Sequence, residues 1–459
     1  MGGLTAAIIE SNLVGGECSY AACMPSKALL RSSAALEAAR RVDGARQAIT
    51  GALDTAAVFA RRTRVTNNWN DESQVKWLAS AGVTLFRGRG RLAGECKVEV
   101  KFFGGSSMTL LTARHAVAIC TGTDPAVPPI AGLGEASPWT NREATRASHV
   151  PPRLAILGGG VVACEMAVVW QSLGSKVTIL ERGQRLMERT EPFVGELIAA
   201  ALRERGVAVH TGVNVTRIER RSPAGEIKIG VEPGGASVAA SIEADELLVA
   251  TGRIPNTREI GLETVGLKPG QWLDVDDTCR VKQIESGWLY SAGDVNHRAL
   301  LTHMGKYQAR VCGDAIAARA KGALKDSPAP PWSKWAATAD HAAVPQVIFT
   351  DPEVASVGLT ESAAREKGLR IRAVEYDIGH VAGAQLLADG YSGHAKMIVD
   401  EDRHVLVGLT LVGQDVGEMI HAATVAVVGE VPIERLWHAV PSYPTMSELW
   451  LRLLEAYGL

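Results

Sequence analysis

The clearest pattern in the chain is a short apolar run, a glycine turn and a long apolar segment. Residues 154–157 are apolar, residues 158–160 are three consecutive glycines, and Val161 to Leu173 is rich in apolar residues. A further apolar run extends from Lys176 to Leu180. This order of strand, turn, helix and strand predicts a βαβ unit, which implies a parallel sheet.

The pattern changes after residue 340. Short strand-like runs at Lys396–Val399 and Val405–Val412 precede an apolar helix-like run at Val416–Val428. An order of strands followed by helices predicts an α+β domain. Proline-marked joints at His149–Pro152 and Ser327–Pro331 divide the chain. A chain of 459 residues is too long for one hydrophobic core.

Composition narrows the class of protein. Apolar residues make up 46% and the net charge is −2, which gives no reason to expect a nucleic-acid or membrane partner. The most apolar stretch, Leu154–Trp170, contains Glu165 and is too interrupted to span a bilayer. Seven cysteines and no signal-peptide pattern in Met1–Asn12 indicate a reducing, cytoplasmic location.

The glycine turn forms a G-x-G-x-x-A dinucleotide-binding fingerprint. Gly158 permits the tight turn, Gly160 lets the backbone approach a pyrophosphate, and Ala163 keeps the helix close to the strand. A bare glycine cluster is often only a turn, but here a strand precedes it and a helix follows. Glu181 ends the second strand about twenty residues on, where a carboxylate binds the adenosine ribose.

The acid at this position bears on which nucleotide is bound. Glu181 would repel the extra phosphate of NADPH, so the sequence favours NADH. Arg182 and Arg185 are close enough to weaken that preference.

A pair of cysteines carries the candidate chemistry. Cys18 and Cys23 are separated by four residues, and Pro25 suits the first turn of a helix. The sequence places Cys23 just before that helix, where the partial positive charge stabilises a thiolate. Cys18 would then be the exposed exchanging thiol. Two small buried residues are the alternative interpretation of a bare pair of this spacing.

The residues around the pair resemble a known family. Residues 15–27 read Gly-Gly-Glu-Cys-(x)₄-Cys-Met-Pro-Ser-Lys and are similar to the active-site signature of dihydrolipoyl dehydrogenase, mercuric reductase and their relatives. Further stretches that look like family motifs follow in the family's order at residues 118–122, 250–256, 290–294 and 349–361. The resemblance implies an α/β fold with two Rossmann-like domains, for FAD and NAD, plus a C-terminal α+β dimerisation domain.

The resemblance also implies site residues and domain limits. Lys27 and Glu165 match residues that pair beside the flavin ring, and Asp294 matches the residue that binds the ribityl chain. The full implied set is Cys18, Cys23, Tyr443 and Glu448 as catalytic residues, Glu10, Lys27, Gly122 and Asp294 for FAD, and Gly158, Gly160, Ala163, Glu165, Glu181 and Gly252 for NAD. The expected domains are residues 1–145 with 268–325 for FAD, 150–267 for NAD(P), and 335–459 for dimerisation.

The C-terminal segment departs from the family. Members that act on thiols carry His-Pro-Thr followed shortly by Glu, and that histidine serves the other subunit's exchanging cysteine as an acid–base group. Here Tyr443 stands in its place, before Glu448. A tyrosine titrates near pH 10 and is a poor general base at neutral pH. Mercuric reductases also have a tyrosine here, but they end in a cysteine pair that this sequence lacks. His438 is a possible substitute base.

The N-terminal segment departs as well. Ala6–Glu10 resembles the family's second strand, with Glu10 at the acid that binds the flavin's adenosine ribose. We therefore expect the first strand and its G-x-G-x-x-G loop, which lie at the centre of the sheet, to be absent. A misassigned start at Met1 and a truncated gene both explain this, and the intact remaining motifs favour the first.

The implied function is an NAD(P)H- and FAD-dependent oxidoreductase that acts on a sulfur group. Electrons would pass from NADH through the flavin and the Cys18–Cys23 disulfide to a small-molecule acceptor, in a homodimer. The acceptor is expected to be a disulfide of the dihydrolipoyl type. The alternatives are a mercuric-reductase-like or quinone-reducing enzyme, and a non-catalytic dimer that has lost FAD.

Overall fold

The computed structural model describes residues 2–104, 107–222, 225–233, 241–325 and 328–459, so Ser327 of the expected linker lies outside the described residues. The chain forms two compact units. The first contains residues 1–20, 66–124 and 253–341, and the second contains residues 21–65, 125–252 and 342–459.

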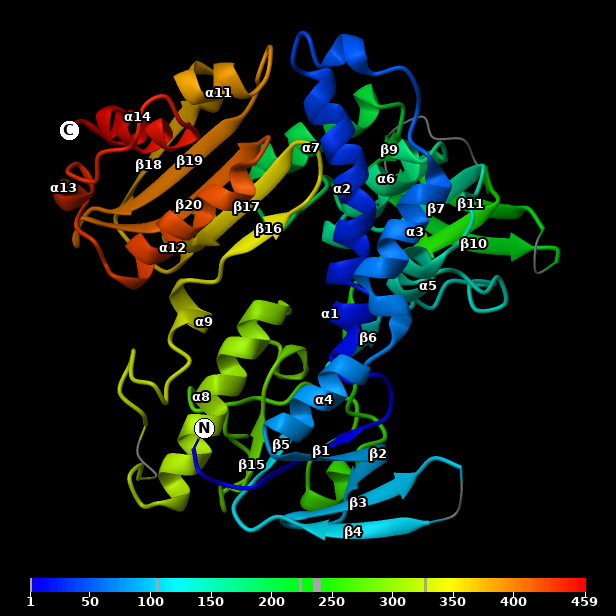
Figure 1. Ribbon diagram of the computed structural model, residues 1–459, viewed down its shortest axis with the longest axis vertical. Coiled ribbons are helices and arrows are strands. Elements are labelled where there is room, and N and C mark those ends of the chain that lie inside the picture. The colour runs from blue at the N-terminus through cyan, green and yellow to red at the C-terminus, as the bar shows by residue number, and fades with distance from the viewer. Residues whose placement is uncertain (1, 105–106, 223–224, 234–240, 326–327) are drawn as a thin grey trace. The chain divides into compact units, whose positions relative to one another are not determined.

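The first unit is built on small sheets (Figure 1). In a four-stranded sheet of order β1-β2-β3-β4, β1 and β2 are parallel and the remaining neighbours are antiparallel. β5 and β15 form a parallel pair. The elements that lie or begin in this unit are β1 (Ala6–Glu10), α1 (Gly16–Tyr20), η2 (Asn67–Trp69), α4 (Glu72–Ser80), β2 (Val83–Leu92), β3 (Lys97–Phe102), β4 (Met108–Thr112), β5 (Val117–Ile119), β6 (Thr123–Pro125), β14 (Arg253–Pro255), η3 (Leu262–Val265), β15 (Leu289–Ser291), η4 (Asp294–Asn296), α8 (Thr302–Ala320) and α9 (Ala339–Ala342).

The second unit carries the predicted βαβ segment and the C-terminal α+β segment. Its elements up to residue 252 are α2 (Cys23–Arg40), η1 (Arg46–Ala48), α3 (Thr55–Val65), α5 (Asn141–Arg146), β7 (Arg153–Leu157), α6 (Val161–Ser172), β8 (Lys176–Leu180), α7 (Pro192–Glu204), β9 (Ala208–His210), β10 (Val213–Arg220), β11 (Ile227–Pro233), β12 (Ser241–Ala244) and β13 (Glu246–Val249). The later ones are β16 (Gln346–Ile348), β17 (Glu353–Gly358), α10 (Glu361–Glu366), β18 (Ile371–Asp377), η5 (Ile378–His380), α11 (Ala382–Leu387), β19 (His394–Asp400), β20 (Val405–Gly413), η6 (Val416–Met419), α12 (Ile420–Val428), α13 (Ile433–Leu436), η7 (Met446–Glu448) and α14 (Leu449–Tyr457).

The predicted βαβ unit is present. β7 and β8 are parallel neighbours in a sheet of order β13-β7-β8-β9, and α6 connects them. Eight consecutive residues of α6, 163–170, are buried, because the helix lies between this sheet and other helices, including α2. Trp170 is fully buried within the resulting core.

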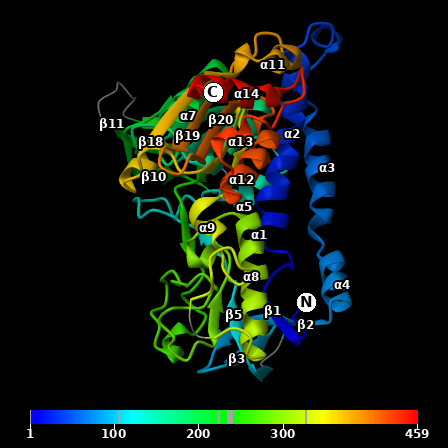
Figure 2. The same cartoon turned by 90° about the vertical axis from the view of Figure 1, so that its left-hand side faces the viewer.

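The C-terminal part of this unit is the predicted α+β segment. Its five-stranded antiparallel sheet has the order β16-β17-β20-β19-β18. α12 packs against β17 and β20, and α14 packs against β18 (Figure 2). The predicted helix-like run from Val416 divides into η6 and α12. The predicted fold class is thus confirmed. No helix among the described residues is long and apolar enough to cross a membrane.

A buried lysine joins the two parts of the second unit. Lys396 in β19 lies 3.5 Å from Glu191, which precedes α7, and 3.3 Å from Glu375 in β18. It also pairs with Glu361, whose backbone N–H donates to Glu191 at 2.6 Å. The Lys396 and Glu191 side chains are only 9% and 2% exposed, so removing either charge leaves the other without compensation in a desolvated site.

We predict that Lys396→Met lowers the free energy of unfolding by about 3 kcal/mol, because Glu191 loses its cation. Lys396 and Arg365 hold the pKa of Glu361 below its usual range. A lowered folded-state pKa adds stability that is present above the unfolded-state pKa and is lost as pH falls through the folded-state pKa. The Lys396→Met variant should therefore lose less stability than the unmodified protein as the pH falls from neutral to acidic. Urea unfolding across acidic pH measures both effects.

Lys76→Met is the matched control, because Lys76 belongs to an exposed pair with Glu72. Equal unfolding midpoints for the two variants would contradict the role given to Lys396.

Candidate active site

Cys18 and Cys23 are joined by a disulfide, as the sequence predicted. Cys18 lies in α1 and Cys23 is the first residue of α2. Both side chains are partly exposed. A half-exposed disulfide at the start of a helix is suited to thiol exchange, since an attacking thiolate can reach it.

The helix start differs slightly from the expected one. Cys23 is itself helical, rather than the residue before the helix, and Pro25 is the third helical residue. The Ser26 N–H donates to the Ala22 carbonyl at 3.0 Å, so the helix begins two residues earlier than Pro25 suggested. The Cys23 sulfur still lies in the first turn, where unpaired N–H groups favour a thiolate.

Lys27 and Glu165 form the predicted pair. The Lys27 Nζ lies 2.6 Å from Glu165 Oε2, and the Glu165 side chain is 4% exposed. The backbone N–H of Phe349 donates to the other Glu165 oxygen at 3.0 Å, and the Lys27 ammonium lies 5.1 Å from the centre of the Phe349 ring. Lys27 is one turn after Cys23 in α2, so the cation is held on the helix that carries the redox cysteine.

The nucleotide loop has the predicted backbone. Gly158 has φ +109°, and a Cβ there would lie 2.4 Å from the Ala250 carbonyl oxygen. Gly160 caps α6, and a Cβ there would meet nothing within 4 Å, so this face of the loop is open to a ligand. Ala163 is fully buried. The Glu181 carboxylate accepts from the Gly183 N–H just beyond β8. An open glycine at a helix start with an anchored acid beside it fits a dinucleotide.

The remaining predicted flavin residues lie in the first unit. Asp294 begins η4 and accepts from the Thr123 hydroxyl at 3.1 Å. Burial raises the pKa of Asp294, while the Thr123 hydrogen bond and the charge of Arg253 oppose the rise. Gly122 has φ +68° and open space where a Cβ would lie. Glu10 ends β1 and accepts from the Asn12 N–H at 2.7 Å. A partly buried acceptor beside an open glycine turn fits the hydroxyl-rich chain of FAD.

Gly252 belongs to the second unit, with φ +135°. Its carbonyl accepts from the Ala126 N–H at 2.9 Å. The positive φ explains why glycine stands at the strand end, since an L-residue would be strained there.

Tyr443 and Glu448 are not brought together. Tyr443 is 76% exposed on the segment between α13 and η7. Glu448 is buried and pairs with Arg452 at 2.6 Å. Among the described residues no hydrogen bond joins Tyr443 to Glu448, and the second Glu448 carboxylate oxygen has no partner.

Sequence reasoning missed a polar network beside the disulfide. Glu17, the residue before Cys18, forms an ion pair with Arg253. Arg253 also donates to the Thr123 hydroxyl at 2.9 Å. Both charged residues lie inside motifs that the sequence singled out, but a separation of 236 residues gives no spacing signal that would pair them.

Cysteines outside the pair are mostly inaccessible. Cys164, Cys279 and Cys312 are buried free thiols. Burial raises the pKa of Cys279 to about 12 and raises those of Cys164 and Cys312 as well. These three thiols are therefore protonated and unreactive at neutral pH.

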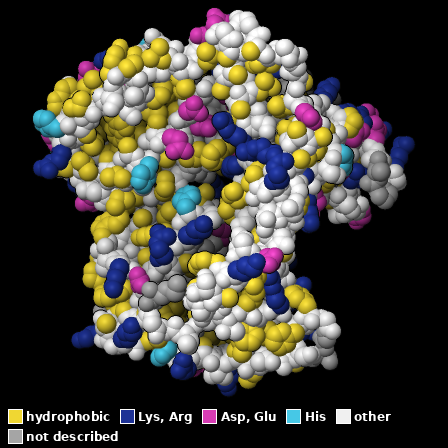
Figure 3. Space-filling view, viewed as in Figure 1, with side chains coloured by type: hydrophobic (Ala, Val, Ile, Leu, Met, Phe, Trp, Pro, Cys, Tyr) yellow, Lys and Arg dark blue, Asp and Glu magenta, His cyan; other side chains and the backbone are white. Residues whose placement is uncertain are grey.

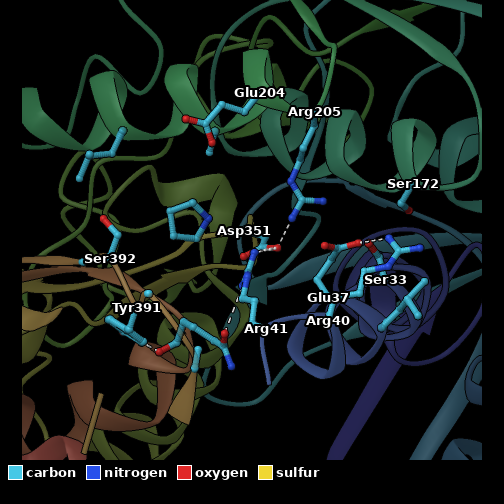
Figure 4. Close-up of a pocket in the computed structure, with 18 of the residues that line it drawn as sticks. Ser33, Glu37, Arg40, Arg41, Ser172, Glu204, Arg205, Asp351, Tyr391 and Ser392 are labelled. Carbon is cyan, nitrogen blue, oxygen red and sulfur yellow. Dashed lines mark hydrogen bonds and ion pairs between the residues drawn. The ribbon is translucent and has the colours of Figure 1, made fainter. Parts of the chain in front are cut away.

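A cavity of about 660 Å³ lies in the second unit, between α2, α7 and the strands that follow residue 350 (Figure 4). Asp351 lines it and pairs with Arg41, at 2.7 Å, and with Arg205. Of the described residues that line it, none is a predicted site residue. No group of three or more His, Cys, Asp or Glu side chains among the described residues could hold a metal ion.

A disulfide suited to thiol exchange, an open glycine loop that fits a dinucleotide, and a lysine paired with a buried glutamate together indicate a thiol oxidoreductase that uses a nucleotide cofactor. The model of one family, described as pyridine nucleotide-disulphide oxidoreductase, matches residues 2–321. The model of its dimerisation domain matches residues 344–453. The chain belongs to this family.

Individual relatives agree with this assignment. The chain is 32% identical to a mercuric reductase of Staphylococcus aureus over 97% of its own length and 77% of the relative's. It is 27% identical to a dihydrolipoyl dehydrogenase of Chlamydia muridarum over 98% of this chain and 90% of the relative. A Cu(II) complex of an HOCl-induced flavoprotein disulfide reductase from Escherichia coli superposes with a TM-score of 0.79 at 25% identity, covering 98% and 93% of the two chains.

The expectation that the N-terminal strand and loop are absent is not borne out. The family model matches from residue 2. β1 is the strand that the sequence predicted at Ala6–Glu10, and it pairs with β2 along all five of its residues. The expectation rested on the missing glycine pattern and on the few residues that precede this strand.

We predict that Gly158→Ala lowers stability and weakens NADH binding, because the added Cβ collides with the Ala250 carbonyl. Gly174→Ala is the matched control, since its φ of +103° is similar but its Cβ would meet nothing within 4 Å. The control should cost about 1–2 kcal/mol of unfolding free energy, from backbone strain alone. Chemical unfolding and NADH titration measure the difference between the two variants. If both variants lose the same stability and the same NADH affinity, the contact with Ala250 is harmless.

Proposed function

We propose that this chain is an NADH-dependent reductase whose acceptor is a soft metal ion, with Hg²⁺ as the test case, rather than a dihydrolipoyl-type disulfide. The observation that carries the proposal is the exposed Tyr443 at the position of the family's acid–base histidine. A phenol is a poor substitute for an imidazole as a general acid–base group at neutral pH.

Proton balance separates the two acceptors. Reduction of a disulfide, NADH + H⁺ + RSSR → NAD⁺ + 2 RSH, delivers protons to the departing thiols. Reduction of a divalent metal ion, NADH + M²⁺ → NAD⁺ + H⁺ + M, delivers none to the acceptor. A site without a neutral-pH base therefore favours the metal ion. Five relatives that are 28–32% identical to this chain are mercuric reductases, which supports the same choice.

The route to the acceptor follows from the family. The chain is an FAD-dependent oxidoreductase that passes electrons from NAD(P)H to the Cys18–Cys23 disulfide and on to a small acceptor. FAD, when bound, links the two-electron chemistry of the nicotinamide to that of the disulfide. We propose that Gly158, Gly160 and Glu181 hold the nucleotide, and that the Lys27 ammonium stabilises negative charge as electrons arrive.

In the first unit, Glu10, Gly122 and Asp294 are proposed to hold FAD. The domain limits expected from the sequence are kept as proposals, as is a cytoplasmic location.

Homodimer formation is proposed from the dimerisation domain and its surface. Apolar side chains gather over this part of the chain in the space-filling view (Figure 3). Val440 is 84% exposed and Val425 is 55% exposed, and Tyr443 lies three residues after Val440. Exposed apolar residues of this size are typical of protein interfaces. A partner seated there would cover Tyr443.

A preference for NADH is proposed from the surroundings of Glu181. Its carboxylate is anchored on the Gly183 N–H, so its negative charge would repel a phosphate placed beside it. Arg185, which could have bound that phosphate, instead donates to the carbonyls of Glu188 and Thr190 at 2.7 and 3.1 Å.

We predict that the enzyme oxidises NADH faster with thiol-buffered Hg²⁺ than with lipoamide at neutral pH. Tyr443→His should raise lipoamide turnover by about 10²-fold, since general acid–base help is worth 10²–10⁴. Tyr443→Phe controls for loss of the ring hydroxyl. Steady-state NADH oxidation with each acceptor measures this. Fast lipoamide turnover by the unmodified enzyme would refute the proposed acceptor and point to another base, such as His438.

For the nucleotide, we predict faster flavin reduction by NADH than by NADPH. Glu181→Gln should narrow the difference, because it removes the charge that repels the extra phosphate. Stopped-flow reduction with both nucleotides measures the ratio, with Glu188→Gln as the nearby control. A preference for NADPH in the unmodified enzyme would mean that Arg182 dominates the site.

A further inference from the structure

We propose that Arg253 is a positioning residue for the redox pair. Its guanidinium compensates the Glu17 carboxylate, directly before Cys18, and shifts the disulfide–dithiol equilibrium toward the dithiol. The proposal rests on the redox use of Cys18 and Cys23 but not on which acceptor is reduced.

The contacts of Arg253 are specific. It is the first residue of β14, and it forms an ion pair with Glu17 in α1. Its Nε donates to the Thr123 hydroxyl at 2.9 Å, and one Nη donates to the Thr123 carbonyl at 2.7 Å. Because Nε and Nη donate to two different oxygens of Thr123, the plane of the guanidinium is fixed. A lysine ammonium could not be held in this way.

The pair is partly shielded from water. The Arg253 and Glu17 side chains are 21% and 18% exposed. Charges in such a site interact more strongly than a fully solvated pair, because water screens them less. Without the Arg253 cation, the negative charge of Glu17 would therefore act on the adjacent Cys18.

Glu17 cannot easily turn away into solvent, because α1 is held at both ends. The Val14 N–H donates to Asp71 at 2.6 Å before the helix starts, and the Trp69 indole donates to the Tyr20 carbonyl at 2.9 Å where it ends. The short helix is thereby fixed, and its Glu17 side chain stays beside Arg253.

Charge determines the direction of the effect. Reducing the disulfide creates two thiols, and the first turn of α2 favours the thiolate form of Cys23. The reduced state thus gains negative charge. A bare carboxylate at Glu17 disfavours that charge and a cation at Arg253 favours it. Losing Arg253 should stabilise the disulfide, and losing the Glu17 charge should stabilise the dithiol.

The same guanidinium supports a second part of the first unit. The Thr123 hydroxyl accepts from Arg253 and donates to Asp294 at 3.1 Å. Because the Thr123 hydroxyl both accepts one hydrogen bond and donates its own proton, its orientation is fixed. Arg253 thus acts on Asp294 through Thr123, and on Cys18 through Glu17.

The test is the redox equilibrium of the Cys18–Cys23 pair in the FAD-loaded protein. Arg253→Met, Glu17→Gln and the double variant are equilibrated with oxidised and reduced dithiothreitol at neutral pH, without NADH or acceptor. Rapid alkylation and mass spectrometry then give the reduced fraction. Arg253→Met should shift the equilibrium constant toward the disulfide by about three- to tenfold, and Glu17→Gln toward the dithiol by about threefold. The double variant should lie within twofold of the unmodified protein.

Arg298→Met is the matched control. Arg298 is also a shielded arginine of the first unit with carboxylate partners, Asp277 and Asp340, and it should leave the equilibrium unchanged. Arg253→Lys keeps the positive charge, so its equilibrium constant should lie close to that of the unmodified protein. The proposal is overturned if Arg253→Met and Glu17→Gln shift the equilibrium in the same direction, or if neither shifts it by more than twofold. If Arg253→Met does not fold, Glu17→Gln alone decides. Because no acceptor is present, a failure here is distinct from a failure of the proposed metal-ion reduction.

Discussion

The pairing of Lys27 with Glu165 is the interaction on which the second unit depends. It joins α2, which begins with Cys23, to α6, which begins at the nucleotide loop. The Glu165 carboxylate is almost fully desolvated and takes a second partner from the Phe349 backbone. A buried carboxylate is tolerated only when its oxygens are satisfied, so these three segments are held in one arrangement. The redox cysteine and the nucleotide loop consequently keep a fixed relation within this unit.

Local pattern was enough to predict the elements that carry the site. The βαβ unit was predictable because its strands are buried on both faces and read as continuous apolar runs, with glycines where the backbone must turn. The start of α2 was predicted two residues late, since Pro25 marks a helix start but does not exclude a turn before it. The Cys18–Cys23 pair and the Lys27–Glu165 pair came from resemblance rather than from periodicity.

Long-range charge pairing could not be predicted in this way. Lys396 lies in a strand where a lysine reads as a solvent-facing residue, yet it is buried among carboxylates from three other segments. Arg253 and Glu17 each belong to a recognisable motif, but nothing in either motif names the other as its partner. The N-terminal expectation also rested on local evidence, a missing glycine pattern and the few residues before β1, whereas the family model matches from residue 2.

The buried cysteines have a consequence for the proposed reduction of a thiol-binding metal ion. Such compounds attack thiolates wherever they find them, including those of the catalyst itself. Cys164, Cys279 and Cys312 are buried and kept protonated, so thiol-binding compounds do not react with these three side chains. Cys96 and Cys120 are the free cysteines of the described residues that keep some exposure, so a thiol-binding ion can reach these two sulfurs besides the Cys18–Cys23 pair.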